Sequence, residues 1–126
     1  METHSTAAQR PLWVLRGPLA ASLEEAAHAI EAFYKDRQNT GALEVCGARL
    51  HEVGGSLRML DLDGALALAR EMEELAAALS DPTRLKHQSA FELLIAATLF
   101  LPRYLDYVRQ RGSENHALLL PTINLL

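Results

Sequence analysis

One histidine in this chain, His51, is surrounded along the sequence by residues with very small side chains. On a helix, residues three and four positions apart are side-chain neighbours. For His51 these positions hold Gly47, Ala48, Gly54 and Gly55. Glycine costs about 1 kcal/mol relative to alanine inside a helix, so the arrangement is costly unless something must approach the imidazole closely. The pattern predicts a histidine that reacts with, or is reached by, another protein.

A carboxylate further along the chain is placed to orient this imidazole. His51 lies ten residues before Asp61, and Glu73 lies eleven residues after Leu62. With a rise of about 1.5 Å per residue, the two side chains stand at equal height if the chain folds back at this turn. A carboxylate that accepts a hydrogen bond from Nδ1–H fixes the tautomer and leaves Nε2 as the free nucleophile. Such an imidazole can accept a phosphoryl group and return it.

The elements that position these residues are helices, because β-branched residues are scarce and alanine, leucine and glutamate dominate. Apolar residues recur at helical spacing in five segments. We expect helices over about 18–36, 42–60, the 61–64 turn to 79, 82 or 85 to 111, and 116–126. Short connections between long amphipathic helices favour antiparallel neighbours. The predicted fold is all-α, an antiparallel four-helix bundle with an accessory C-terminal helix.

Individual residues mark the expected helix ends. Asp61 or Asp63 can cap the third helix, and Pro82 suits the first position of the fourth. Pro102 lies inside the fourth helical pattern and should kink it. Gly112 should end that helix.

Length and composition limit the classes of function. The chain has 126 residues and a net charge of −4, which suits one domain and argues against a nucleic-acid partner. No apolar run reaches the roughly 18 residues needed to span a membrane, so we expect no membrane insertion. The polar start lacks the apolar core of a signal peptide, and the single cysteine, Cys46, excludes an internal disulfide. These features favour the cytoplasm.

The same residues limit cofactors and domain organisation. His28, His87 and His116 lie on different segments without ligand spacing, so we expect no metal or other cofactor. We expect a flexible tail over 1–10 and a single helical domain over 11–126. The apolar end, Leu118–Leu126, is typical of a domain that belongs to the N-terminal part of a longer chain.

The segment from His51 to Leu75 resembles a histidine phosphotransfer (HPt) domain, whose motif places a glycine four residues after the histidine, as Gly55 is. The resemblance is strongest to the first domain of chemotaxis-type kinases that control type IV pili and twitching motility, and to their kinase-less relatives. It covers about Leu12 to Leu126. It rests on the segments HEVGGSLRML (51–60), EME (71–73), LPRYL (101–105) and LLPTIN (119–124).

The resemblance implies a role for each of these residues. His51 would be the phosphoacceptor, Glu73 its carboxylate partner, and Gly55 the glycine that permits close approach. The docking surface would consist of Gly47, Gly54, Gly55 and Arg58. The implied partners are a kinase catalytic domain and a response-regulator receiver domain. Because the chain has no nucleotide-binding motif, we expect no catalytic activity from it in isolation.

One position departs from the family pattern. The family usually has lysine three residues after the histidine, where its charge neutralises the phosphoryl group, but this chain has Gly54. Arg58 is on the same face but about 10 Å further along the axis. Some relatives have lost the histidine and act through protein contacts. The two hypotheses are therefore a phosphotransfer module and a non-phosphorylated interaction or scaffold domain in the same pathway.

Simpler explanations exist for each of these residues. His51 could be an ordinary surface histidine, and the glycines could allow two helices to pack closely. Glu73 belongs to an acidic run, Glu71–Glu74, that could be a solvated face. Cys46 falls at an inward-facing position and is expected to be a core residue.

Overall fold

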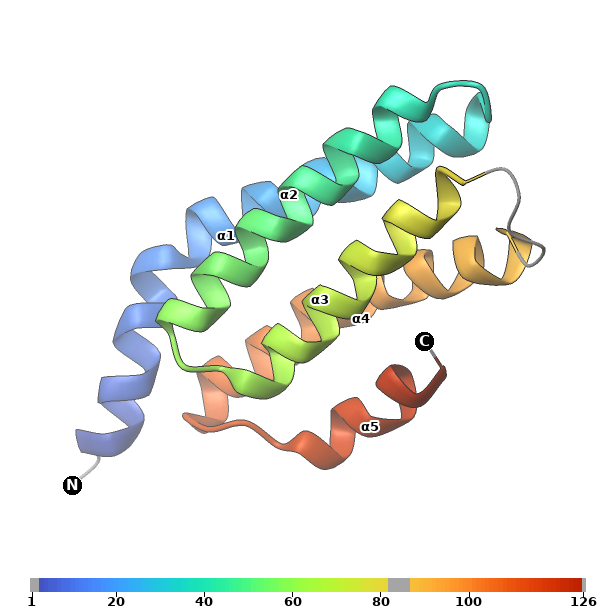
Figure 1. The fold of residues 1–126 in the computed structure, drawn as a ribbon. Coiled ribbons are helices and arrows are strands. Elements are labelled where there is room, and N and C mark those ends of the chain that lie inside the picture. Colours follow the sequence, from blue (N-terminus) through green and yellow to red (C-terminus); the bar gives the residue numbers. More distant parts are fainter. Residues whose placement is uncertain (1–2, 82–86, 126) are drawn as a thin grey trace.

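The computed structural model describes residues 3–81 and 87–125. Its helices are α1 (Thr3–Lys35), α2 (Thr40–Met59), α3 (Asp63–Leu79), α4 (His87–Arg111) and α5 (His116–Leu125). Contacts join α1 to α2, α2 to α3, α3 to α4 and α4 back to α1, which closes a four-helix bundle. Figure 1 shows these helices running antiparallel, with α5 along one edge, where it packs on α3. The predicted fold class is confirmed.

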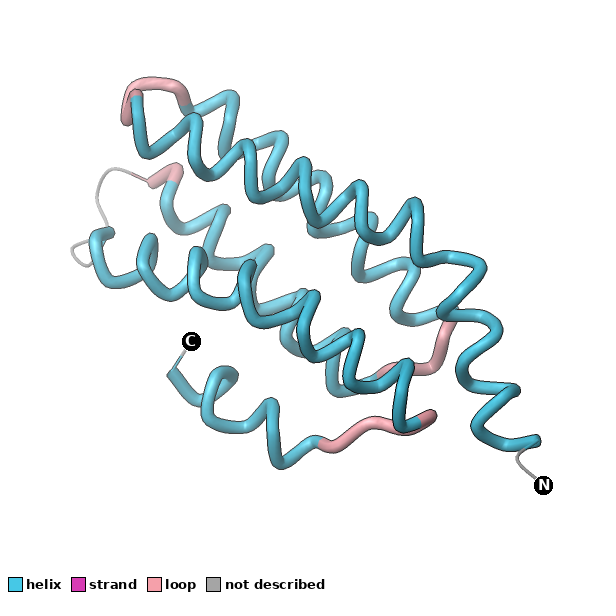
Figure 2. Tube along the Cα trace, turned by 180° about the vertical axis from the view of Figure 1, so that it is seen from behind, coloured by secondary structure: helices cyan, strands magenta, loops and turns pink. Residues whose placement is uncertain are grey.

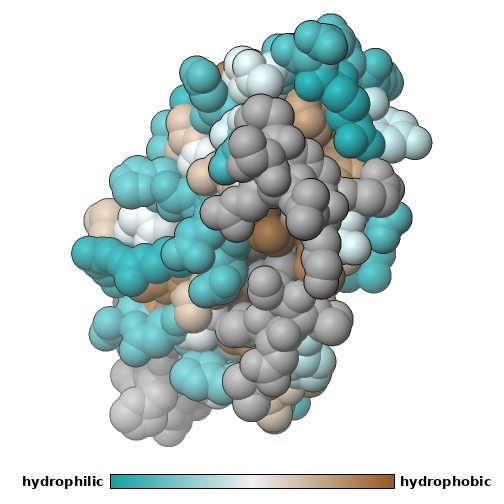
Figure 3. Space-filling view, turned by 45° about the vertical axis from the view of Figure 1, so that its right-hand side comes forward, coloured by the Kyte–Doolittle hydropathy of each residue, from teal (hydrophilic) through white to brown (hydrophobic). Residues whose placement is uncertain are grey.

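Apolar residues from the four long helices fill the centre of the bundle. On α2, Leu50, Val53 and Leu57 are fully buried, and Leu68 and Leu94 meet them from other helices. Burying one such side chain stabilises the fold by about 1.5–3 kcal/mol. On the face shown in Figure 3, hydrophilic residues cover much of the described surface, and hydrophobic ones appear mainly in recesses between them.

Cys46 is part of this core, as predicted, with 1% of its surface exposed. Burial raises the pKa of its thiol to about 11, because the thiolate loses its hydration inside the bundle. The residue therefore contributes packing volume to the fold.

Most helix ends follow from local sequence. The Asn39 side chain caps α2 by accepting a hydrogen bond from the Ala42 N–H at 3.2 Å. Gly112 ends α4 as predicted, with a φ of 80° that glycine adopts without strain. Pro102 lies inside α4, as predicted. The predicted starts of α4 at Pro82 or Leu85 lie outside the described residues.

The N-terminal end of α1 differs from the expectation. The helix begins at Thr3, whereas the sequence predicted a start near Pro18 after a tail over 1–10. The expectation rested on the apolar stripe, which begins at Leu19, a buried residue. Figures 1 and 2 show that the first turns of α1 project past the other helices.

The predicted caps of α3 were wrong. The N-cap residue is Leu62, and it makes no capping hydrogen bond through its side chain. The carboxylate of Glu114, from the connection between α4 and α5, instead accepts hydrogen bonds from the N–H groups of the first turn of α3. Asp61 and Asp63 are exposed. A residue about fifty positions away in sequence therefore does what the local aspartates were expected to do.

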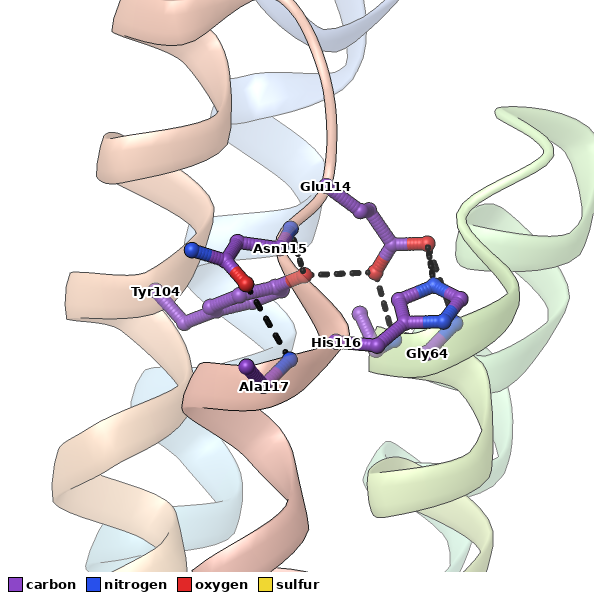
Figure 4. Close-up of polar contacts among 7 residues, drawn as sticks. Gly64, Tyr104, Glu114, Asn115, His116 and Ala117 are labelled. Atoms are coloured by element: carbon purple, nitrogen blue, oxygen red, sulfur yellow. Dashed lines mark hydrogen bonds and ion pairs between the residues drawn. The ribbon is translucent and has the colours of Figure 1, made fainter.

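Glu114 links three helices (Figure 4). Its carboxylate accepts the N–H of Gly64 at 3.0 Å, the N–H of Ala65 at 2.9 Å and the O–H of Tyr104 at 2.9 Å. The Asn115 N–H donates to the Tyr104 hydroxyl at 3.2 Å. The Glu114 side chain is only 10% exposed, and a negative charge at a helix N-terminus is favourable. These contacts fix the start of α5 against α3 and α4.

Gly64 lies where α5 comes closest to α3. A Cβ at this position would lie 2.6 Å from Leu119 Cδ1 and 2.8 Å from His116 Cδ2. Alanine is normally about 1 kcal/mol better than glycine in a helix, but here these side chains, together with the Glu114 carboxylate at 2.9 Å, would have to move. We expect Gly64→Ala to lower the free energy of unfolding by about 1–2 kcal/mol in urea denaturation. Gly47→Ala, where a Cβ meets no described atom within 4 Å, is the control and should be neutral or stabilising. A stabilised Gly64→Ala variant would contradict the observed packing.

Tyr104 makes stability depend on alkaline pH. Burial, followed by the hydrogen bond to Glu114 and its negative charge, raises the pKa of Tyr104 well above its usual range. Because the folded pKa exceeds the unfolded value of about 10, the contribution of the neutral phenol to stability is complete below about pH 10 and is lost above it. We expect the free energy of unfolding to fall less steeply in Tyr104→Phe than in the wild type between about pH 9.5 and 11.5. Equal slopes in denaturant titrations would contradict this assignment.

Candidate functional site

His51 and Glu73 meet on the outer edge of α2 and α3. Nδ1 of the imidazole lies 3.2 Å from Oε2 of the carboxylate, within hydrogen-bond distance. The histidine side chain is 79% exposed and the glutamate side chain 37%. A neutral imidazole that donates from Nδ1 has its lone pair on Nε2. The pair therefore presents an open, oriented imidazole, and the equal height predicted for the two residues is confirmed.

The turn between α2 and α3 sets this register. The Leu62 N–H donates to the Leu57 carbonyl and the Asp61 N–H to the Arg58 carbonyl, each at 3.0 Å. These two bonds make a Schellman motif, the common way to close a helix C-terminus. Asp61 takes the left-handed conformation that glycine usually fills there, with a φ of 62°, and aspartate tolerates this better than most residues. The tight turn lets α3 return directly along α2.

The packing of this chain does not require the glycines of α2 around His51. At Gly47 and Gly55 a Cβ would meet no described atom within 4 Å. Gly54 was expected at the docking surface, but it is buried next to Leu66 of α3. A Cβ there would lie 3.5 Å from Leu66 Cδ1, an ordinary contact. Close helix packing thus does not explain the glycines, since alanine fits at all three positions.

Two open hollows flank the pair, and His51, Glu52 and Glu73 border both. The first, about 640 Å³, contains Gly47 together with small residues such as Ala48 and Ala76. The second, about 370 Å³, has Gly54 and Gly55 on one side and Arg58, Leu66 and Arg70 around the rest. The structure therefore brings together all of the predicted site residues along one face of α2 and α3, here called the α2–α3 face.

Arg70 is a site residue that the sequence analysis missed. It lies three residues before Glu73, one helical turn away on the same side of α3. The sequence of α2 indicates Arg58 as a charge near His51, whereas Arg70 comes from the facing helix. The spacing to Glu73 was the signal that could have identified it.

Other classes of site find no support in the part of the chain that the structure describes. Over residues 3–81 and 87–125, no group of three or more histidine, cysteine, aspartate and glutamate side chains is arranged to hold a metal ion. No helix there combines the length and apolar character needed to cross a membrane.

One curated protein is similar to most of the length of this chain. Over 113 residues the chain is 33% identical to Scaffold protein FimL of Pseudomonas aeruginosa. The alignment covers 90% of this chain but 20% of FimL, so the chain spans about one fifth of that relative. FimL is thus a homologue of this chain over that part of its length. No family model matches the chain, and no solved structure matches it.

Proposed function

We propose that this bundle is a protein–protein docking domain that acts as a scaffold in a chemosensory pathway controlling type IV pili. The observation that carries the proposal is the pair of glycines on either side of His51, the half-buried Gly47 and the exposed Gly55. Each costs about 1 kcal/mol relative to alanine, and the fold requires neither. A partner that must come close to the helix backbone explains both.

The comparison and the surface chemistry support the same proposal. The homologue is named a scaffold protein, and the resemblance of the motifs to kinase-less relatives supports a role in the type IV pilus pathway. The partner would be a kinase catalytic domain or a response-regulator receiver domain in the cytoplasm. Its contact would cover the His51–Glu73 pair and the two hollows beside it. Docking of this kind needs no chemistry at the imidazole.

Phosphotransfer is the second candidate, and the hydrogen bond between Nδ1 and Glu73 favours it. In that reaction the Nε2 lone pair forms the bond to phosphorus while the bond from phosphorus to the leaving oxygen of ATP breaks. Glu73 would stabilise the Nδ1–H of the charged imidazole. We place this candidate second because Gly54 stands where the family usually has a lysine, so the position three residues after His51 carries no charge to neutralise the phosphoryl group.

Binding in the absence of ATP separates the two candidates. We expect the domain to bind the kinase core, or a receiver of the same pathway, saturably in calorimetry when neither protein is phosphorylated. The second arm adds kinase core and labelled ATP. Two results together would favour phosphotransfer over docking. The first is an acid-labile label that is absent in His51→Gln, and the second is no binding before ATP is added. Binding without label would support the scaffold role.

A further inference from the structure

The charged side chains around the second hollow are not all paired. Glu52 is held by Arg49, at 3.1 Å between Nη1 and Oε2, and by the Ser22 hydroxyl at 3.3 Å. Glu73 is held by His51 at 3.2 Å. Both carboxylates that border this hollow therefore already have a partner within the domain.

The two arginines of the hollow, unlike its carboxylates, have no ion-pair partner among the described residues. Arg58 from α2 and Arg70 from α3 are exposed and line the same space. Neither forms an ion pair with any residue within the described ranges 3–81 and 87–125. A guanidinium group offers five N–H donors in a planar fork that fits an oxyanion through two parallel hydrogen bonds. The hollow thus presents two guanidinium groups that form no ion pair within the described residues.

We propose that this hollow is a carboxylate-binding site, and that the partner inserts an acidic side chain between Arg58 and Arg70. The inference rests on the proposed docking function and gives the chemistry of its partner: an acidic segment. The exposed Gly55 has no side chain to block entry, and the space of about 370 Å³ accommodates a glutamate side chain. Because the chain as a whole carries a net charge of −4, the two arginines also limit where an acidic partner can approach.

An acidic peptide tests the site without the natural partner. Hexaglutamate is titrated into the ¹⁵N-labelled domain, and the signals of the Gly54 and Gly55 amides and of the Arg58 and Arg70 Nε–H groups are followed. We expect saturable shifts at these signals, and none with hexaglutamine. Arg70→Gln should weaken binding about fivefold, the effect of losing one exposed ion pair worth about 1 kcal/mol.

The matched control is Arg103→Gln, which removes the same charge from an exposed position on α4 outside the hollow. It should change the affinity by less than about twofold. Equal weakening by Arg70→Gln and Arg103→Gln, or shifts spread over all arginines, would overturn the proposal. Saturation of the hollow by inorganic phosphate but not by hexaglutamate would also overturn it. If hexaglutamate does not bind but the kinase core or receiver does, the carboxylate site is wrong and the proposed docking function is unaffected.

Discussion

Replacing Gly55 by tryptophan is expected to abolish binding at the α2–α3 face while leaving the bundle folded. Gly55 is exposed, and a Cβ there meets no described atom within 4 Å, so the indole can extend into solvent without disturbing the core. The same indole would occupy the space that a partner needs beside His51. We expect the affinity for the kinase core or receiver to fall by at least about 100-fold, or roughly 2.8 kcal/mol, in calorimetry.

Two variants control for this effect. Gly55→Ala adds only a methyl group and should bind almost as well as the wild type while gaining up to about 1 kcal/mol of stability. Ala96→Trp places the same large side chain at an exposed position on α4 and should leave binding unchanged. If Gly55→Trp binds normally, or if Ala96→Trp is equally defective, the α2–α3 face is not the docking surface.

Replacing Glu114 by alanine is expected to be the most destabilising single change at the connection between α4 and α5. It leaves the N–H groups of Gly64 and Ala65 and the hydroxyl of Tyr104 without the acceptor that they share. Each unsatisfied, partly buried group costs about 1–3 kcal/mol, with water compensating in part. We expect the free energy of unfolding to fall by about 3 kcal/mol in urea denaturation. Amide hydrogen exchange should accelerate first at the start of α3.

The control for this change is Glu74→Ala, which removes an exposed glutamate from the same bundle and should alter stability by less than about 0.5 kcal/mol. Glu114→Gln keeps one oxygen acceptor and should lie between alanine and the wild type. A Glu114→Ala variant as stable as Glu74→Ala would show that the carboxylate does not hold α3 and α5 together.

The helices and the central pair could be predicted because their signals are local. The inward positions of α2 repeat in the sequence, and Gly112 is a common helix terminator. The meeting of His51 and Glu73 followed from counting helical rise on either side of one short turn. In each case residues close in sequence contain the whole signal.

The features that the sequence did not reveal depend on contacts between distant segments. Glu114 caps a helix that begins about fifty residues earlier, and no periodicity indicates such a pairing. Gly54 is buried because Leu66 from the facing helix covers it. Arg70 joins the site from α3. All three follow from how the elements pack, which the residues of α2 alone do not determine.

The docking role is tested most directly by the affinity of His51→Gln for the unphosphorylated kinase core or receiver, measured beside the wild type. His51 is 79% exposed and lies outside the core, so glutamine is tolerated, and its amide can still donate to Glu73. If the face acts through contact, we expect the affinity to change by less than about threefold, the scale of one exposed polar contact. A loss as large as that predicted for Gly55→Trp would contradict docking that does not depend on the imidazole.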